Sequence, residues 1–145
     1  QLCEEAGLSW YELSNWSKPG KECLHNIAYW KSANWWGLGP GAHSHIDQKR
    51  FWNIKHPTAY KQKLFAKESP IADSEDLTDE QLRDESIMLA IRMRSGLSLD
   101  LLSSVAQERV MQYQSSGHLN QIDGKLQLTA QGRMIADRLV REALG

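Results

Sequence analysis

The stretch YELSNWSKPGKECLHNIAYWKSANWWGLGPGAHSH, which runs from Tyr11 to His45, decides how the fold of this chain is interpreted. It contains four of the six tryptophans, the pair His25-Asn26 close to Tyr29-Trp30, and three glycines within five residues. Aromatic side chains can wall a large flat ligand, a His or Asn can fix its orientation, and Gly lets the backbone approach it closely. The stretch therefore indicates a concave binding site rather than a plain core.

The composition is that of a globular protein. The chain has 145 residues, a hydrophobic content of 41% and a mean hydropathy of −0.55, which suit one ordinary domain or two small ones. No window offers the ~20 apolar residues of a membrane span, and we expect no signal peptide. Two cysteines suit a reducing compartment, so we expect a cytoplasmic protein. The chain does not begin with Met, and we expect it to be a piece of a longer protein.

The two halves of the chain differ in composition and charge. All tryptophans lie at or before Trp52, and residues 1–74 carry nine Lys or Arg against seven Asp or Glu, a net charge of +2. Residues 75–145 carry eight against eleven, a net charge of −3. Neither half has the basic footprint of a nucleic-acid-binding protein, so no nucleic-acid partner is expected. The polar stretch Lys67–Thr78, which contains Pro70, is interpreted as a linker.

The first half predicts short and mixed elements. Leu8–Leu13 is apolar and aromatic, as a buried strand would be, and Ala28–Trp30 and Trp35–Leu38 are interpreted as further extended pieces. Thr58–Lys67 has the periodicity of a helix. Glu12 lies inside the first apolar run, where a buried carboxylate needs a partner, and an ion pair is expected there.

The second half predicts a winged-helix arrangement. Thr78–Gln81 is a capping box that begins a helix, and Asp123-Gly124 is a two-residue turn between the strands Leu119–Ile122 and Lys125–Leu128. Thr129 caps a last helix whose expected buried face is Met134, Ile135, Leu139, Val140 and Ala143. The helix that would read DNA, Gln107–Ser116, has a single Arg, which favours a packing or protein-contact role.

The composite pattern YELSNWSKPG…HNIAYW…WWGLGPGAHS is similar to the last part of the catalytic barrel in the radical-SAM, oxygen-independent coproporphyrinogen III oxidase family. Glu85–Leu97 (ESIMLAIRMRSGL) and Asp123–Gly132 (DGKLQLTAQG) resemble that family's C-terminal domain. The resemblance covers essentially the whole chain in order. It implies an α+β fold: the C-terminal end of a radical-SAM partial (β/α) barrel in residues 1–56, a helix and linker in 57–74, and a winged-helix-like, mostly helical domain in 75–145.

The resemblance also implies a function. One branch of the family is the oxidase, and the other is a heme chaperone marked by HNxxYW, which residues 25–30 match in full. The chaperone branch implies binding of heme or porphyrin and transfer to heme-acceptor proteins. It also implies S-adenosyl-L-methionine (SAM) and a [4Fe-4S] cluster in the missing N-terminal barrel. The cluster motif CxxxCxxC is absent from this chain, and Cys3 and Cys23 do not replace three thiolates. The chain alone is therefore expected to run no radical chemistry, and the oxidase and a free-standing winged-helix adaptor remain alternatives.

The cofactor-binding residues implied by the resemblance are His25, Asn26, Tyr29, Trp30, Gly37, Gly39 and Gly41. His25 is the candidate heme iron ligand, since imidazole is a common axial ligand, and the glycine loop is placed near SAM. Alternatives stay open: His25 can be a structural histidine, and the loop can be a tight turn.

Cys23 is a possible second heme contact. His43 and His45 share a strand face, but apart from Asp47 no Cys, Asp or Glu stands at metal-site spacing from them. Open strand edges in residues 1–56 make a homodimer possible.

Overall fold

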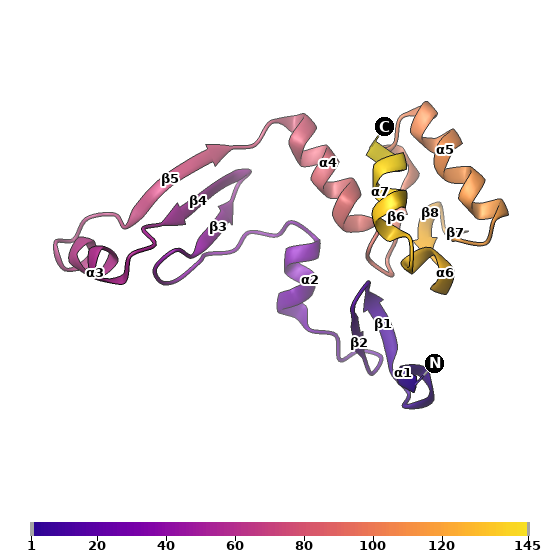
Figure 1. Cartoon of the computed structure of the whole chain (residues 1–145), viewed down its shortest axis with the longest axis horizontal. Coiled ribbons are helices and arrows are strands. Elements are labelled where there is room, and N and C mark those ends of the chain that lie inside the picture. Colours follow the sequence, from indigo (N-terminus) through magenta and orange to yellow (C-terminus); the bar gives the residue numbers. More distant parts are fainter. Residues whose placement is uncertain (1, 145) are drawn as a thin grey trace. The chain divides into compact units, whose positions relative to one another are not determined.

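The computed structural model describes residues 2–144, which fold into two compact units. Residues 1–31 and 83–145 make up the first unit, and residues 32–82 make up the second. Figure 1 shows the elements in chain order, with the second unit coloured from violet to magenta. The first unit is therefore built from two segments that are far apart in the sequence.

The C-terminal segment of the first unit has the predicted winged-helix arrangement. Its helices and strands, in chain order, are α4 (Asp79–Ala90, whose first residues belong to the second unit), β6 (Leu97–Ser98), the 3-10 helix η1 (Leu99–Leu101), α5 (Ser104–Ser115), β7 (Leu119–Ile122), β8 (Lys125–Leu128), α6 (Ala130–Arg133) and α7 (Ala136–Leu144). The antiparallel sheet has the order β6-β8-β7, and α5 and α7 pack against each other (Figure 1). The mixed helix-and-sheet class is confirmed.

The start and turn signals of this segment act as the sequence predicts. The amide of Gln81 donates to Thr78 Oγ1 at 3.2 Å and the Thr78 amide donates to Gln81 Oε1 at 2.8 Å, which completes the capping box of α4. Asp123 and Gly124 have φ values of 51° and 75°, as the tight turn between β7 and β8 requires. The Gly132 amide donates to Thr129 Oγ1 at 3.0 Å, so Thr129 caps α6.

The core of the first unit gathers apolar side chains from the helices α4, α5 and α7 and from the strands β6, β7 and β8. Its buried members are Ile87, Ile91, Leu97, Leu102, Ala106, Val110, Leu119, Leu126, Leu128, Ala136, Leu139, Val140 and Ala143. Trp10 and Leu13 from the N-terminal segment are partly buried against this cluster. The core therefore joins the two segments of the unit by hydrophobic contact.

The prediction that Met134 lies in the core is wrong. Met134 is 85% exposed, because the last helix is broken into α6, which ends at Arg133, and α7, which begins at Ala136. The break changes the helical phase, so that Leu139, Val140 and Ala143 are buried as predicted while Met134 points to solvent.

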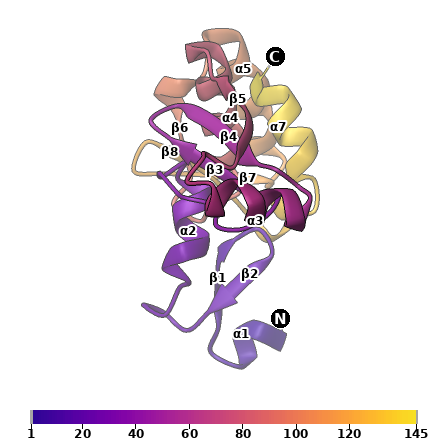
Figure 2. The same cartoon turned by 90° about the vertical axis from the view of Figure 1, so that its left-hand side faces the viewer.

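The N-terminal segment of the first unit contains α1 (Leu2–Glu5), β1 (Ser9–Glu12), β2 (Asn15–Ser17) and α2 (Leu24–Trp30). β1 and β2 form an antiparallel hairpin, seen near α1 in Figure 2, and β1 lies within the predicted strand Leu8–Leu13. The prediction of extended structure at Ala28–Trp30 is wrong, because these residues complete α2. Tyr and Trp fit strands by propensity, but here the helical spacing of the neighbouring residues dominates.

The second unit is a three-stranded antiparallel sheet with one helix. Its elements are β3 (His43–Ile46), β4 (Lys49–Asn53), α3 (Pro57–Phe65) and β5 (Ile71–Asp76), and the sheet order is β3-β4-β5. The polar composition of Lys67–Thr78 predicts a linker, but this stretch contains β5, all of whose residues are exposed. This strand forms because the edge of β4 offers unpaired backbone groups, and Lys49 and Arg50 of β4 lie opposite Asp76 and Glu75. Within residues 2–144, no helix combines the length and apolarity needed to cross a membrane.

Candidate functional site

Helix α2 gathers the HNxxYW residues along one side. In a helix, residues four apart are neighbours, so His25 lies beside Tyr29 and Asn26 lies beside Trp30. The two variable positions of the motif, Ile27 and Ala28, complete the turn between these pairs. The spacing of the motif thus has a local physical meaning, since it places a His, an Asn and two aromatic residues on one broad helical face.

The outer part of this face is an exposed imidazole next to an aromatic edge. The rings of His25 and Tyr29 lie 4.8 Å apart between centroids at an interplanar angle of 81°, an edge-to-face contact. His25 is exposed and Tyr29 is 40% exposed, whereas Asn26 and Trp30 are half-buried. An exposed imidazole with an aromatic neighbour has the chemistry needed to ligate a heme iron and to contact an apolar macrocycle.

The inner part of the face is tied to the hairpin. Asn26 Nδ2 donates to the hydroxyl of Tyr11 at 3.3 Å, and Tyr11 lies in β1. Tyr11 lies outside the site residues that the sequence predicts. The only sequence signal for it is its place in the same composite pattern, 15 residues before Asn26.

Cysteine chemistry in this chain is limited to two free thiols. Cys23 is exposed at the N-cap of α2, and Cys3 is half-buried in α1. Across residues 2–144, no three His, Cys, Asp or Glu side chains cluster as a metal site would need. The residues present therefore do not fit a [4Fe-4S] cluster, which takes thiolate ligands in sets of three or four.

The glycine loop of the second unit uses its backbone groups internally. The Gly37 amide donates to Ser44 Oγ at 2.9 Å, the Gly39 amide to the Tyr60 hydroxyl at 3.3 Å, and the Gly41 amide to the Ile54 carbonyl at 3.0 Å. A Cβ at position 37 would lie 2.0 Å from the His43 carbonyl oxygen. These contacts favour the tight turn, and contact of Gly37, Gly39 and Gly41 with SAM stays a prediction that rests on the resemblance.

The two histidines of β3 differ in burial. His43 is exposed and stacks on Trp52 with a centroid distance of 5.6 Å, while His45 is 5% exposed and lies 4.9 Å from the ring of Trp35. Neither ring nitrogen of His45 has a hydrogen-bond partner among the residues that the structure describes. The two histidines share a strand with no further metal-binding side chain gathered at them in the described residues.

Glu12 has different partners from those expected. It is 1% exposed, and its carboxylate accepts hydrogen bonds from the Ser14 amide and hydroxyl, both at 3.3 Å, and from the Asn15 side-chain amide. Among the described contacts of Glu12, neutral donors thus replace the predicted cation. The carboxylate closes the β1–β2 hairpin, so Glu12 is structural.

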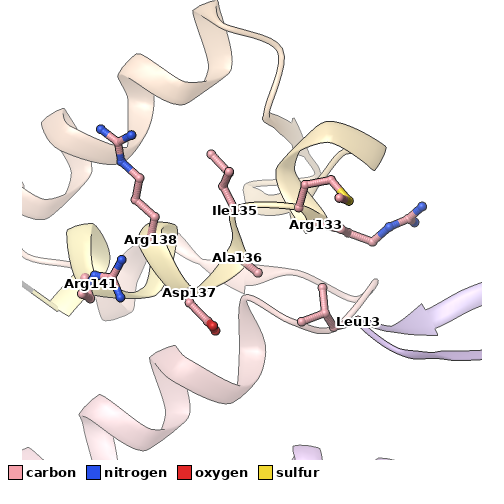
Figure 3. A pocket seen from close by; sticks show the side chains of 8 residues that line it. Leu13, Arg133, Ile135, Ala136, Asp137, Arg138 and Arg141 are labelled. Carbon is pink, nitrogen blue, oxygen red and sulfur yellow. The ribbon is translucent and has the colours of Figure 1, made fainter.

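A pocket that sequence analysis missed lies at the α6–α7 break. Figure 3 shows this pocket of about 310 Å³, with Leu13 facing the break and arginine side chains around it. Arg133 and Arg138 point in opposite directions. The Arg133 guanidinium lies 4.8 Å from the ring of Trp10 and 5.1 Å from the ring of Trp16, and that of Arg138 lies 5.7 Å from Tyr113. The Arg133 and Arg138 guanidinium groups thus lie on different aromatic rings and do not converge on one point in this pocket.

We expect Arg133→Gln to lower the free energy of unfolding by about 1 kcal/mol, since cation–π contacts contribute roughly 0.5–2 kcal/mol. Chemical denaturation followed by tryptophan fluorescence measures this loss. Arg141→Gln, at an exposed position of the same pocket, should change stability by less than about 0.5 kcal/mol. Equal losses for the two variants would show that the contact with Trp10 and Trp16 adds nothing.

Comparison with known proteins agrees with this architecture. Residues 77–135 match the HemN C-terminal domain family. The heme chaperone HemW of Mycobacterium tuberculosis is 44% identical over 140 residues, which cover 97% of this chain and 36% of that protein. The heme chaperone HemW of Bacillus subtilis is 29% identical over 154 residues, covering 98% of this chain and 40% of that protein. The solved structure of coproporphyrinogen III oxidase (HemN) from Escherichia coli, a radical SAM enzyme, superimposes with a TM-score of 0.70 at 16% identity, covering 97% of this chain and 38% of the other.

The winged-helix segment and the HNxxYW helix thus define the class: the chain belongs to the radical-SAM, coproporphyrinogen III oxidase-like proteins, of which it corresponds to the C-terminal part. Within this class it falls in the branch of the heme chaperone HemW. The chain spans little more than a third of the length of these relatives.

Proposed function

We propose that this chain is the C-terminal part of a heme chaperone, a protein that binds heme and transfers it to acceptor proteins. The observation that carries the proposal is the exposed His25 imidazole on helix α2, set edge-to-face against Tyr29 inside a complete HNxxYW motif. The likeness to proteins named heme chaperone over 97% of the chain supports it.

In this proposal the motif residues divide between contact with heme, which is the cargo, and support of the helix. A ring nitrogen of His25 ligates the iron, and Tyr29 and Trp30 contact the apolar macrocycle. Asn26 faces the hairpin and holds the helix rather than the ligand, because its amide is bonded to Tyr11. An exposed site suits transfer, since a ligand held at the surface can be passed to a partner without unfolding the protein.

SAM and the [4Fe-4S] cluster belong to the missing N-terminal barrel in this proposal. The two cysteines of this chain do not supply the cluster's ligands, so no radical step is assigned to its residues. The ranges 1–56, 57–74 and 75–145 remain our proposal for the division of the longer protein. A reducing cytoplasm as the site of action and homodimer formation are proposals of the same kind, and sedimentation of the longer protein tests the dimer.

We expect His25→Ala in the longer protein to weaken heme binding roughly 10-fold or more, equivalent to about 1.4 kcal/mol, because the iron loses its imidazole ligand. Titration with heme, followed by the position and intensity of the Soret band, measures the effect. His56→Ala is the matched control, since His56 is also exposed but lies outside the motif. An unchanged Soret band and affinity in His25→Ala would exclude His25 as the ligand.

The oxidase is the alternative function, and the same protein tests it. The likeness to the E. coli oxidase is at 16% identity and shows the fold alone. If the longer protein consumed coproporphyrinogen III under reducing conditions with SAM and failed to retain heme, the chaperone proposal would be wrong.

A further inference from the structure

We propose that Tyr11 is the residue that positions the HNxxYW helix, so that its hydroxyl group sets the orientation of the heme-binding face. This inference rests on the proposed function. It concerns a residue outside the motif, on the strand β1, which contacts the motif through Asn26.

Helix α2 needs an external anchor. It has seven residues, no fully buried side chain, and no side-chain hydrogen bond at its N-cap Cys23. Isolated helices of this length are not stable in water, because few backbone bonds offset the cost of nucleation. The orientation of the helix must therefore come from its contacts with neighbouring elements.

Tyr11 supplies such a contact from a rigid position. Its side chain is 9% exposed, and its hydroxyl accepts the 3.3 Å hydrogen bond from Asn26 Nδ2. Neighbouring residues in a strand point to opposite faces, and the preceding residue, Trp10, contacts Arg133 of the winged-helix segment. Strand β1 thus has one face toward Arg133 and presents Tyr11 on the other, toward α2.

The backbone of β1 is held at Tyr11 itself and at the next residue, Glu12. The Tyr11 carbonyl accepts a hydrogen bond from the Arg94 amide at 3.0 Å, and Glu12 forms a β-bridge with Met93. The buried Glu12 carboxylate holds the hairpin turn through Ser14. The anchor therefore extends from the winged-helix core through β1 to the motif helix.

The hydrogen bond from Asn26 to Tyr11 determines which face of α2 points outward. Asn26 is adjacent to His25 in sequence, about 100° away around the helix axis. Holding Asn26 against the hairpin leaves His25 and Tyr29 exposed, as observed. Without the bond the helix can rotate, and the His25 imidazole loses its fixed direction toward the iron.

The test uses Tyr11→Phe, which removes only the hydroxyl, in the longer protein. We expect faster hydrogen exchange of the α2 amides in the heme-free protein. We also expect a 2- to 10-fold weaker heme affinity, roughly the effect of one neutral hydrogen bond, with a changed low-spin EPR signal of the bound heme. Tyr113→Phe is the control, because the Tyr113 hydroxyl also takes part in a hydrogen bond in this unit, as the donor to Glu142 Oε1 at 3.4 Å, but lies outside α2 and β1.

A double-mutant cycle with Asn26→Ala separates a positioning role from a general loss of stability. If the two residues act through their bond, the double variant binds heme no more weakly than the worse single variant. Unchanged α2 exchange in Tyr11→Phe overturns the inference, and so do additive losses in the cycle or an unchanged affinity and EPR signal. Failure of the unsubstituted protein to bind heme at all would instead overturn the proposed function, so the two failures are distinguishable.

Discussion

Leu139→Ala is expected to lower the free energy of unfolding of the first unit by about 3 kcal/mol, within the 2–5 kcal/mol found for buried Leu→Ala changes. Leu139 is fully buried in α7 and belongs to the core cluster. The substitution removes apolar contacts and leaves a cavity that a close-packed core fills only in part. Urea denaturation, followed by circular dichroism, measures the loss as a lower transition midpoint at unchanged slope.

Met134→Ala is the matched control for this prediction. The sequence pattern places both residues on one buried helical face, whereas the structure leaves Met134 85% exposed at the α6–α7 break. We expect a change of less than about 0.5 kcal/mol for Met134→Ala. Comparable destabilisation by both substitutions would mean that α6 and α7 form one continuous helix with Met134 in the core.

Gly37→Ala is expected to destabilise the second unit by about 3 kcal/mol or more, the upper range for overpacking. The added Cβ would lie 2.0 Å from the His43 carbonyl oxygen and 2.7 Å from its carbonyl carbon. Both are backbone atoms, so no side-chain rotation relieves the overlap. Hydrogen exchange measures the effect at amides of the second unit, such as those of His45 and Asn53, which donate to Trp35 and Ala42.

Leu38→Ala tests whether the loss of stability in Gly37→Ala comes from the close approach of Gly37 to the His43 carbonyl. Leu38 is the next residue of the loop and is 85% exposed, so its truncation should leave exchange in the second unit unchanged. The prediction also separates the two interpretations of the glycine loop. If Gly37→Ala kept full protection in the second unit and weakened only SAM binding by the longer protein, the loop would act as a cofactor contact rather than as a turn.

The structural features that the sequence predicts correctly are those determined by residues close together in the chain. The capping box at Thr78 and Gln81 and the turn at Asp123 and Gly124 need only neighbouring residues and backbone preferences. The HNxxYW motif indicates its four residues as a group, and they form two pairs spaced four apart, His25 with Tyr29 and Asn26 with Trp30. That spacing is a sufficient signal for a helix, since it places both pairs on one face.

The structural features that the sequence does not predict depend on contacts between residues that are far apart in the chain. Strand β5 lies in a polar stretch without strand propensity and forms because β4 offers a free edge with charged residues in register. The Arg133 guanidinium, from the end of α6, lies over the rings of Trp10 and Trp16, more than a hundred residues earlier in the chain. The bond from Asn26 to Tyr11 likewise joins two elements whose contact no periodicity indicates.

The first unit has a consequence for synthesis on the ribosome, because its two segments are separated by the whole of residues 32–82. Strand β1 and the HNxxYW helix are translated early, but the Met93 and Arg94 backbone groups that anchor β1 come roughly eighty residues later. At typical elongation rates of 5–20 residues per second, the early segment waits about 4 to 16 s for this anchor. A nascent or prematurely terminated chain thus carries an unanchored HNxxYW helix until Met93 and Arg94 have been synthesised.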